Sequence, residues 1–83
     1  MGKNRVMKLS ELRQNKVAKI TSIEIASDEI RERLSDFGLQ VGQSISLVDK
    51  SPFGGPKAFH LSHGVFAIDT EVTEDISVEV ESQ

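Results

Sequence analysis

Hydrophobic and polar positions alternate along much of this chain, as they do in β-strands that bury one face. Ile76, Val78 and Val80 are separated by polar residues, and this period of two predicts a final strand that is apolar on one side only. The same reasoning predicts four earlier strands, which run through residues 17–25, 44–48, 59–61 and 65–69.

The first of these strands changes phase in its middle. Ala18 and Ile20 share one face, whereas Ile23 and Ile25 fall on the other face by strict alternation. A change of face within one strand indicates a bulge or a strong bend near residues 21–22. Because a bent strand can serve two parts of a curled sheet, this feature favours a small barrel.

The clearest helical period lies between residues 27 and 37. Ile30, Leu34 and Phe37 recur at i, i+4 and i+7, which places them on one side of a helix. Ser27 is a suitable N-cap, and Gly38 is a suitable residue to end the helix in a left-handed conformation. We therefore predict one amphipathic helix inserted after the first strand.

Turns and short helical turns account for most of the remaining chain. Two prolines and two glycines interrupt the pattern at residues 52–56, and residues 10–12 and 70–75 suit single helical turns. The predicted fold is mostly β: a small, partly open antiparallel β-barrel of about five strands. Its last strand is expected beside the first, with Glu79 and Glu81 protecting the remaining edge.

The length of 83 residues allows a single domain. Residues 1–6 are interpreted as a short N-terminal extension or an expression remnant, and residues 7–83 as the domain itself. No apolar run approaches the roughly 20 residues that cross a bilayer, and no secretory signal is recognisable at the N-terminus. We therefore expect a cytoplasmic protein without direct insertion into a membrane.

Charge and cysteine content narrow the function classes further. The net charge is −3, with ten basic residues scattered among thirteen acidic ones. Nucleic-acid binding requires clustered basic residues, so nucleic acid is not an expected partner. The chain has no cysteine, which excludes disulfides and thiolate metal sites.

The polar residues do not form a recognisable catalytic or cofactor site. No serine or histidine stands in a nucleophile–base arrangement, and Gly54-Gly55 lacks the lysine of a phosphate-binding loop. His60 and His63, with Asp69, are the only candidates for a metal site, if Asp69 approaches His60 across a hairpin. Because they match no ligand motif, the prediction is no enzyme, no cofactor and no metal site.

Four segments in the same order give the chain a family resemblance. LSEL at residues 9–12, RLSDFGLQVG at 33–42, PFGGP at 52–56 and ISV at 76–78 resemble the corresponding segments of the FeoA family. The resemblance spans nearly the whole chain. It implies an SH3-like barrel that serves as a cytoplasmic accessory of the FeoB ferrous-iron transporter, at the inner face of the membrane.

The chain departs from the family pattern at three places. Gln14-Asn15 replaces a frequent Pro-Gly, and Val41 replaces a frequent proline. Asp69 stands where the family usually has an arginine after the Ala-Leu pair. If that arginine meets an acidic partner surface, the reversed charge of Asp69 changes the contact.

A partner-binding surface is expected at the helix end and the proline–glycine loop. The residues assigned to this surface are Leu39, Pro52, Phe53, Gly54, Gly55 and Pro56. Phe53 is the stronger apolar anchor, since its loop is not expected to be deeply buried. For Leu39, packing against the core is the alternative. Binding one state of the transporter better than another would regulate it.

A second function remains open at this stage. Iron-dependent repressors carry a similar SH3-like barrel at their C-terminus, so the chain could be a detached regulatory domain of that kind. Such a domain would contact a metal site or a proline-rich peptide. It carries no DNA-reading helices and therefore would not act as a repressor by itself.

Overall fold

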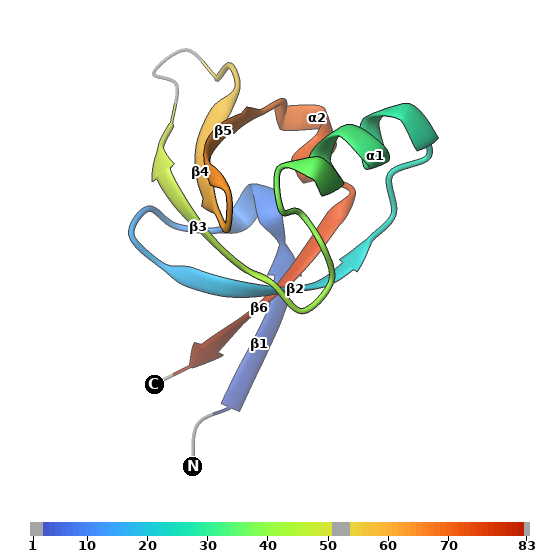
Figure 1. The fold of residues 1–83 in the computed structure, drawn as a ribbon. Coiled ribbons are helices and arrows are strands. Elements are labelled where there is room, and N and C mark those ends of the chain that lie inside the picture. The colour runs from blue at the N-terminus through green and yellow to red at the C-terminus, as the bar shows by residue number, and fades with distance from the viewer. Residues whose placement is uncertain (1–2, 51–53, 83) are drawn as a thin grey trace.

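A computed structural model describes residues 3–50 and 54–82 (Figure 1). These residues form six strands, two α-helices and one turn of 3-10 helix (η1). In chain order the elements are β1 (Lys3–Lys8), η1 (Leu9–Glu11), β2 (Val17–Ile23), α1 (Asp28–Asp36), β3 (Ser44–Asp49), β4 (Lys57–Leu61), β5 (Gly64–Ile68), α2 (Thr70–Thr73) and β6 (Ile76–Ser82).

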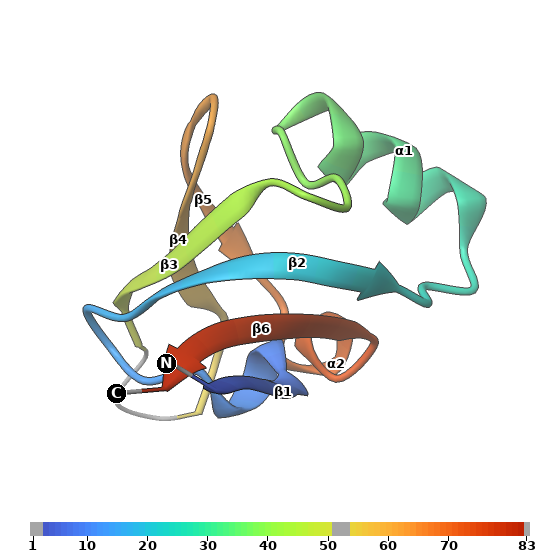
Figure 2. The same ribbon diagram turned by 90° about the horizontal axis from the view of Figure 1, so that it is seen from below.

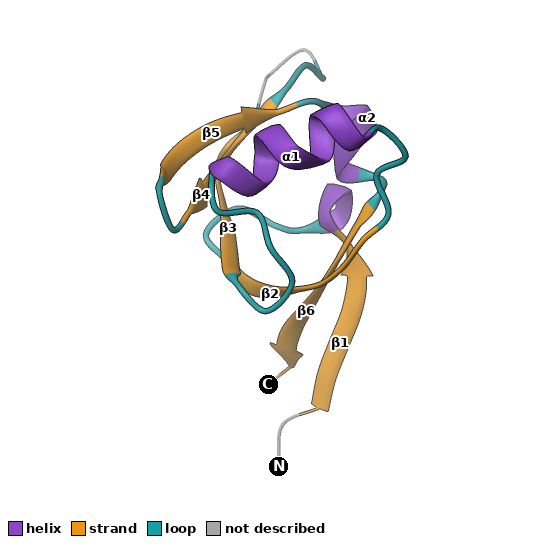
Figure 3. Ribbon diagram, turned by 45° about the vertical axis from the view of Figure 1, so that its right-hand side comes forward, coloured by secondary structure: helices purple, strands orange, loops and turns teal. Residues whose placement is uncertain are grey.

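All six strands belong to one antiparallel sheet. Their order is β1-β6-β2-β3-β4-β5, so β1 and β5 are the two edges. The sheet curls strongly, and α1 lies over its open side near β5 and α2 (Figures 1 and 3). The predicted fold class is confirmed: a mostly β, partly open antiparallel barrel with one helix inserted after the first predicted strand.

The expected number of strands was one too low. Residues 3–6, interpreted as an extension, form the first part of β1, which pairs with β6 from Lys3↔Ser82 to Lys8↔Ser77 (Figure 2). Val6 is largely exposed, so β1 carries little apolar alternation. Its strand conformation depends on hydrogen bonding to a distant strand, which a local pattern does not reveal.

The position of β6 also corrects one expectation. The last strand does pair with β2, as predicted, but it also pairs with β1 on its other side. Because β6 is paired on both sides at Glu79, that residue does not protect an edge of the sheet.

The core lies inside the curled sheet and takes residues from almost every element. Phe59 on β4 is its largest fully buried side chain. The buried apolar residues are Leu9, Leu12, Ala18, Ile20, Ile25, Leu34, Leu39, Ile45, Leu47, Phe59, Leu61, Ile68, Ile76 and Val78. The predicted bend of β2 is present, since its pairing with β6 shifts register between Ile20 and Ser22, and Ile25 then returns to the core.

Helix α1 begins and ends as its sequence predicts. The Ser27 hydroxyl accepts a hydrogen bond from the backbone N–H of Ile30 at 3.3 Å, which caps the first turn. Gly38 ends the helix with a φ of +101°, and the N–H of Leu39 then bonds the carbonyl of Leu34 at 2.9 Å. This turn directs Leu39 into the core.

None of the helices in the described part of the chain has the length and apolar character needed to cross a membrane.

Candidate functional site

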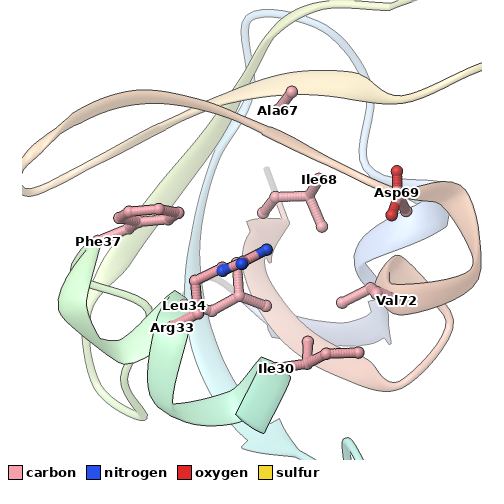
Figure 4. A pocket seen from close by; sticks show the side chains of 8 residues that line it. All are labelled: Ile30, Arg33, Leu34, Phe37, Ala67, Ile68, Asp69 and Val72. Atoms are coloured by element: carbon pink, nitrogen blue, oxygen red, sulfur yellow. The ribbon is translucent and has the colours of Figure 1, made fainter.

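The candidate site is a groove between α1 and the segment that joins β5 to α2. Figure 4 shows side chains from both sides facing this hollow, which has a volume of about 340 Å³. Its lining is mainly apolar, with one basic and one acidic side chain. The lining residues are Ile30, Arg33, Leu34, Phe37, Ala67, Ile68, Asp69 and Val72.

The helical period of α1 explains one wall of the groove. Leu34 is buried and anchors the helix to the core, Phe37 is half-buried, and Ile30 keeps 39% of its surface exposed. Exposure therefore differs along the predicted apolar side of the helix: Leu34 packs into the barrel, whereas Ile30, near the start of the helix, is partly open to solvent. An open apolar side chain beside a hollow is available for contact with another molecule.

Side chains, rather than a backbone ladder, attach the end of α1 to the β4–β5 hairpin. The rings of Phe37 and Phe66 stack with centroids 4.2 Å apart. His63 Nδ1 lies 2.9 Å from the carbonyl oxygen of Asp36. These contacts fix one end of α1 on the hairpin, and the groove opens beside the rest of the helix.

The other wall is held in place by two threonines of α2. Thr73 is fully buried, and its hydroxyl donates to the carbonyl of Thr70 at 2.6 Å. The Thr70 hydroxyl lies within hydrogen-bonding distance of the carbonyl oxygens of Gly54 (3.3 Å) and Gly55 (3.2 Å). The end of the proline–glycine loop is therefore joined to the start of α2, next to the groove.

Two residues of opposite charge lie on different sides of the groove. Arg33 comes from α1, and Asp69 stands directly before α2, where it is the N-cap residue without a side-chain capping bond. Both side chains are exposed. Asp69, which the sequence singles out as a departure from the family pattern, therefore contributes its charge to the groove itself.

The residues predicted for partner binding separate into three groups. Leu39 is only 2% exposed and belongs to the core, so its predicted surface role is wrong and the packing alternative is correct. Pro52 and Phe53 lie outside the described residues. Gly54, Gly55 and Pro56 are described and are at least partly exposed, beside α2.

The histidines and Asp69 do not come together. His60 pairs with Val65, whereas Asp69 follows the far end of β5, about 13 Å along the strand at about 3.3 Å per residue. The condition stated for a metal site there, that Asp69 approaches His60 across the hairpin, is therefore not met. Across residues 3–50 and 54–82, no three His, Asp or Glu side chains are grouped so that they could hold a metal ion.

Several groove residues were not predicted from the sequence. Ile30, Leu34 and Phe37 were signalled by the helical period, but Ala67 and Val72 carry no local mark of a binding role. They join the site only because the antiparallel pairing of β5 and the short α2 bring them opposite α1.

The curled antiparallel sheet with a helix over its open side defines the class of this molecule, a small SH3-like β-barrel. The family model described as the FeoA domain matches residues 7–80, which is most of the chain. The chain therefore belongs to the FeoA family, whose members are accessory proteins of ferrous-iron transport. No curated protein matches the chain significantly.

Solved structures of FeoA proteins agree with this assignment. The FeoA protein of Chlorobium tepidum has 31% identity and a TM-score of 0.82, and the match covers 89% of this chain and 70% of that one. The FeoA of Stenotrophomonas maltophilia, solved as a complex with zinc and described as an SH3 domain protein, has 29% identity and a TM-score of 0.73. That match covers 87% of this chain and 88% of the other.

A manganese-dependent transcriptional repressor also shares the fold. Its match has a TM-score of 0.78 and covers 98% of this chain and 44% of the repressor, at 12% identity. This low identity supports a likeness of fold alone.

Proposed function

We propose that this chain is a non-enzymatic accessory protein of ferrous-iron uptake that binds the cytoplasmic part of a FeoB-type, GTP-dependent iron transporter. The observation that carries the proposal is the FeoA family match over residues 7–80. The open apolar groove between α1 and α2 supplies a surface on which a protein partner can be held. The site of action is the inner face of the membrane, reached through the transporter.

Regulation by such a protein requires unequal binding to the states of the transporter. A ligand that binds every nucleotide state equally shifts none of them, however tightly it binds. We therefore expect this chain to prefer one nucleotide state and to increase the population of that state.

The test is capture of detergent-solubilised FeoB-type transporter by the immobilised protein. Capture is measured with a non-hydrolysable GTP analogue, with GDP and without nucleotide. We expect capture that is specific and differs among the three conditions. Absence of capture in all three, with circular dichroism showing that the immobilised protein is folded, would contradict the proposal.

Since the repressor shares the fold of this chain, one second candidate stays open. A detached regulatory domain of the repressor type would bind a metal site or a proline-rich peptide within its own regulatory system. This candidate gains support if the transporter is not captured while a proline-rich peptide is bound.

A further inference from the structure

The surface beside the groove, here called its rim, carries more negative than positive charge. On α1, Glu29 and Asp36 stand four residues before and three residues after Arg33, so both are its neighbours on the helix surface. On the opposite side, Asp69 borders the groove and Glu71 lies in the first turn of α2. All five side chains are exposed, and four of them are acidic.

None of these four carboxylates belongs to an ion pair found among residues 3–50 and 54–82. Those ion pairs join Lys8 to Glu74 and Asp28 to Arg31. Within the lining, the charges of Arg33 and Asp69 offset each other. Glu29, Asp36 and Glu71 do not line the groove but add three negative charges to the surface beside it. Such a surface attracts a partner that is apolar at one point and basic around it.

The dimensions of the groove limit what can enter it. A volume of about 340 Å³ is at the small end of protein ligand sites, which measure roughly 300–1,000 Å³. The stacked rings of Phe37 and Phe66 hold the end of α1 against the hairpin. The space therefore suits one or two apolar side chains from a short segment and is too small for the apolar face of a whole helix.

We infer that the groove binds a short, basic protein segment, inserting one apolar side chain between α1 and α2 while flanking Lys or Arg residues meet the acidic rim. This inference rests on the proposed function, and within it the segment is a cytoplasmic loop close to the membrane. Short cytoplasmic loops of membrane proteins carry an excess of Lys and Arg. The transporter's membrane portion therefore offers the chemistry that the rim requires.

An anionic lipid surface does not offer the positive charge that the acidic rim would attract. The cytoplasmic leaflet has a negative surface potential and attracts basic, not acidic, protein surfaces. The four rim carboxylates therefore oppose direct docking of the groove on lipid, and a basic protein segment is the occupant that the charges favour.

The first test is a titration of isotopically labelled protein with a short peptide that carries one leucine between two pairs of lysines. We expect saturable binding, with the largest NMR shift changes at Ile30, Ala67 and Val72. A peptide with glutamates in place of the lysines controls for charge, and one with serine in place of the leucine controls for the apolar anchor. Both are expected to bind at least about tenfold more weakly.

Three results of this titration would overturn the inference. They are absence of binding by the lysine–leucine peptide, equal binding of the serine peptide, and shift changes centred away from the groove. Vesicles containing phosphatidylserine form a separate arm, in which binding that perturbs the groove residues would also overturn it. Raising the salt concentration is expected to weaken peptide binding several-fold, because exposed charges are screened.

Three variants of the protein test which side chains contribute to peptide binding. Ile30→Ala removes an exposed apolar contact and is expected to weaken peptide binding about five- to tenfold. Val41→Ala is the matched control, since Val41 is also exposed but does not line the groove. Asp69→Asn preserves shape, removes one rim charge and is expected to weaken binding about threefold. Equal affinity of all three variants for the peptide would contradict the inference.

The same variants separate this inference from the proposed function. If the intact transporter captures wild-type protein and Ile30→Ala equally well, the groove is not the contact, although the accessory role stands. If no transporter is captured but the peptide binds in the groove as described, the proposed partner is wrong and the chemistry of the groove is retained. Thermal melting of each variant confirms that it is folded.

Discussion

The two sides of this barrel are held together in different ways. On one side, β1, β6 and β2 are joined by backbone ladders, and β1 pairs with β6 along its whole length. On the other side, α1 is attached to the β4–β5 hairpin through the Phe37–Phe66 stack and the contact between His63 and the Asp36 carbonyl. A ladder of backbone hydrogen bonds joins neighbouring strands along their length. The side-chain contacts of α1 are separate from one another, and they leave space between the helix and the barrel.

The surfaces of the two sides differ accordingly. On the first side, β1 and β2 carry the exposed basic residues Arg5, Lys8 and Lys19, and β6 carries Glu79 in register with Lys19. Exposed apolar residues on that side, such as Val6 and Val17, stand singly on their strands. On the α1 side, apolar residues gather around a hollow with an acidic rim. The candidate binding groove therefore lies on the side where α1 is attached by side-chain contacts, and not on the side where strands pair through their backbones.

The largest effect on this comparison is expected from the residue that anchors α1 to the core. Leu34→Ala removes a buried side chain and is expected to lower the free energy of unfolding by about 2–5 kcal/mol. Ile30→Ala, on the open part of the same helix, is expected to cost less than about 1 kcal/mol. Urea unfolding followed by circular dichroism measures both. Equal costs would mean that the helix is not packed as described.

Much of the ladder side could be predicted from the sequence. A strand that buries one face can be recognised by alternating apolar and polar residues. The predicted burial of Ile76 and Val78 and the predicted bend after Ile20 are both present in the structure. β1 was missed because its stability comes from hydrogen bonds to β6, which lies about 70 residues later. Such a distant pairing leaves no local pattern in a strand with few buried side chains.

The groove was predictable only in part, for a different reason. The helical period identified Leu34 and Phe37, but which part of that side stays open depends on how α1 sits against β5. The surface prediction for Leu39 failed because its burial is set by the turn at Gly38, whose geometry sends the chain inward. Exposure at a helix end is therefore a property of the packed structure.

A smaller effect is expected at the close approach between α1 and the hairpin. Gly38 has a φ of +101°, and a β-carbon built on it would overlap the rotatable Ser62 hydroxyl and lie 3.3 Å from the Ser62 backbone nitrogen. Gly38→Ala is therefore expected to destabilise the protein by about 2–3 kcal/mol, from backbone strain together with crowding.

Gly42 provides the matched control for this substitution. Its φ is +93°, but no atom lies within 4 Å of the position that a β-carbon would take. Gly42→Ala therefore reports the backbone strain alone, for which we expect about 1 kcal/mol. Urea unfolding of both variants gives the difference, which is the contribution of the contact with Ser62. If the two variants lose the same stability, the end of α1 does not approach the hairpin this closely.

The smallest of these effects concerns the ring stack that closes one end of the groove. A double-mutant cycle with Phe37→Leu and Phe66→Leu isolates the interaction between the two rings, and we expect a coupling of about 0.5–1.5 kcal/mol. Each substitution keeps an apolar side chain of similar reach, so the cycle measures the ring geometry more than burial. Additive losses in urea unfolding, within about 0.3 kcal/mol, would show that the stack contributes little. Attachment of α1 to the barrel would then rest on Leu34 and on the turn at Gly38.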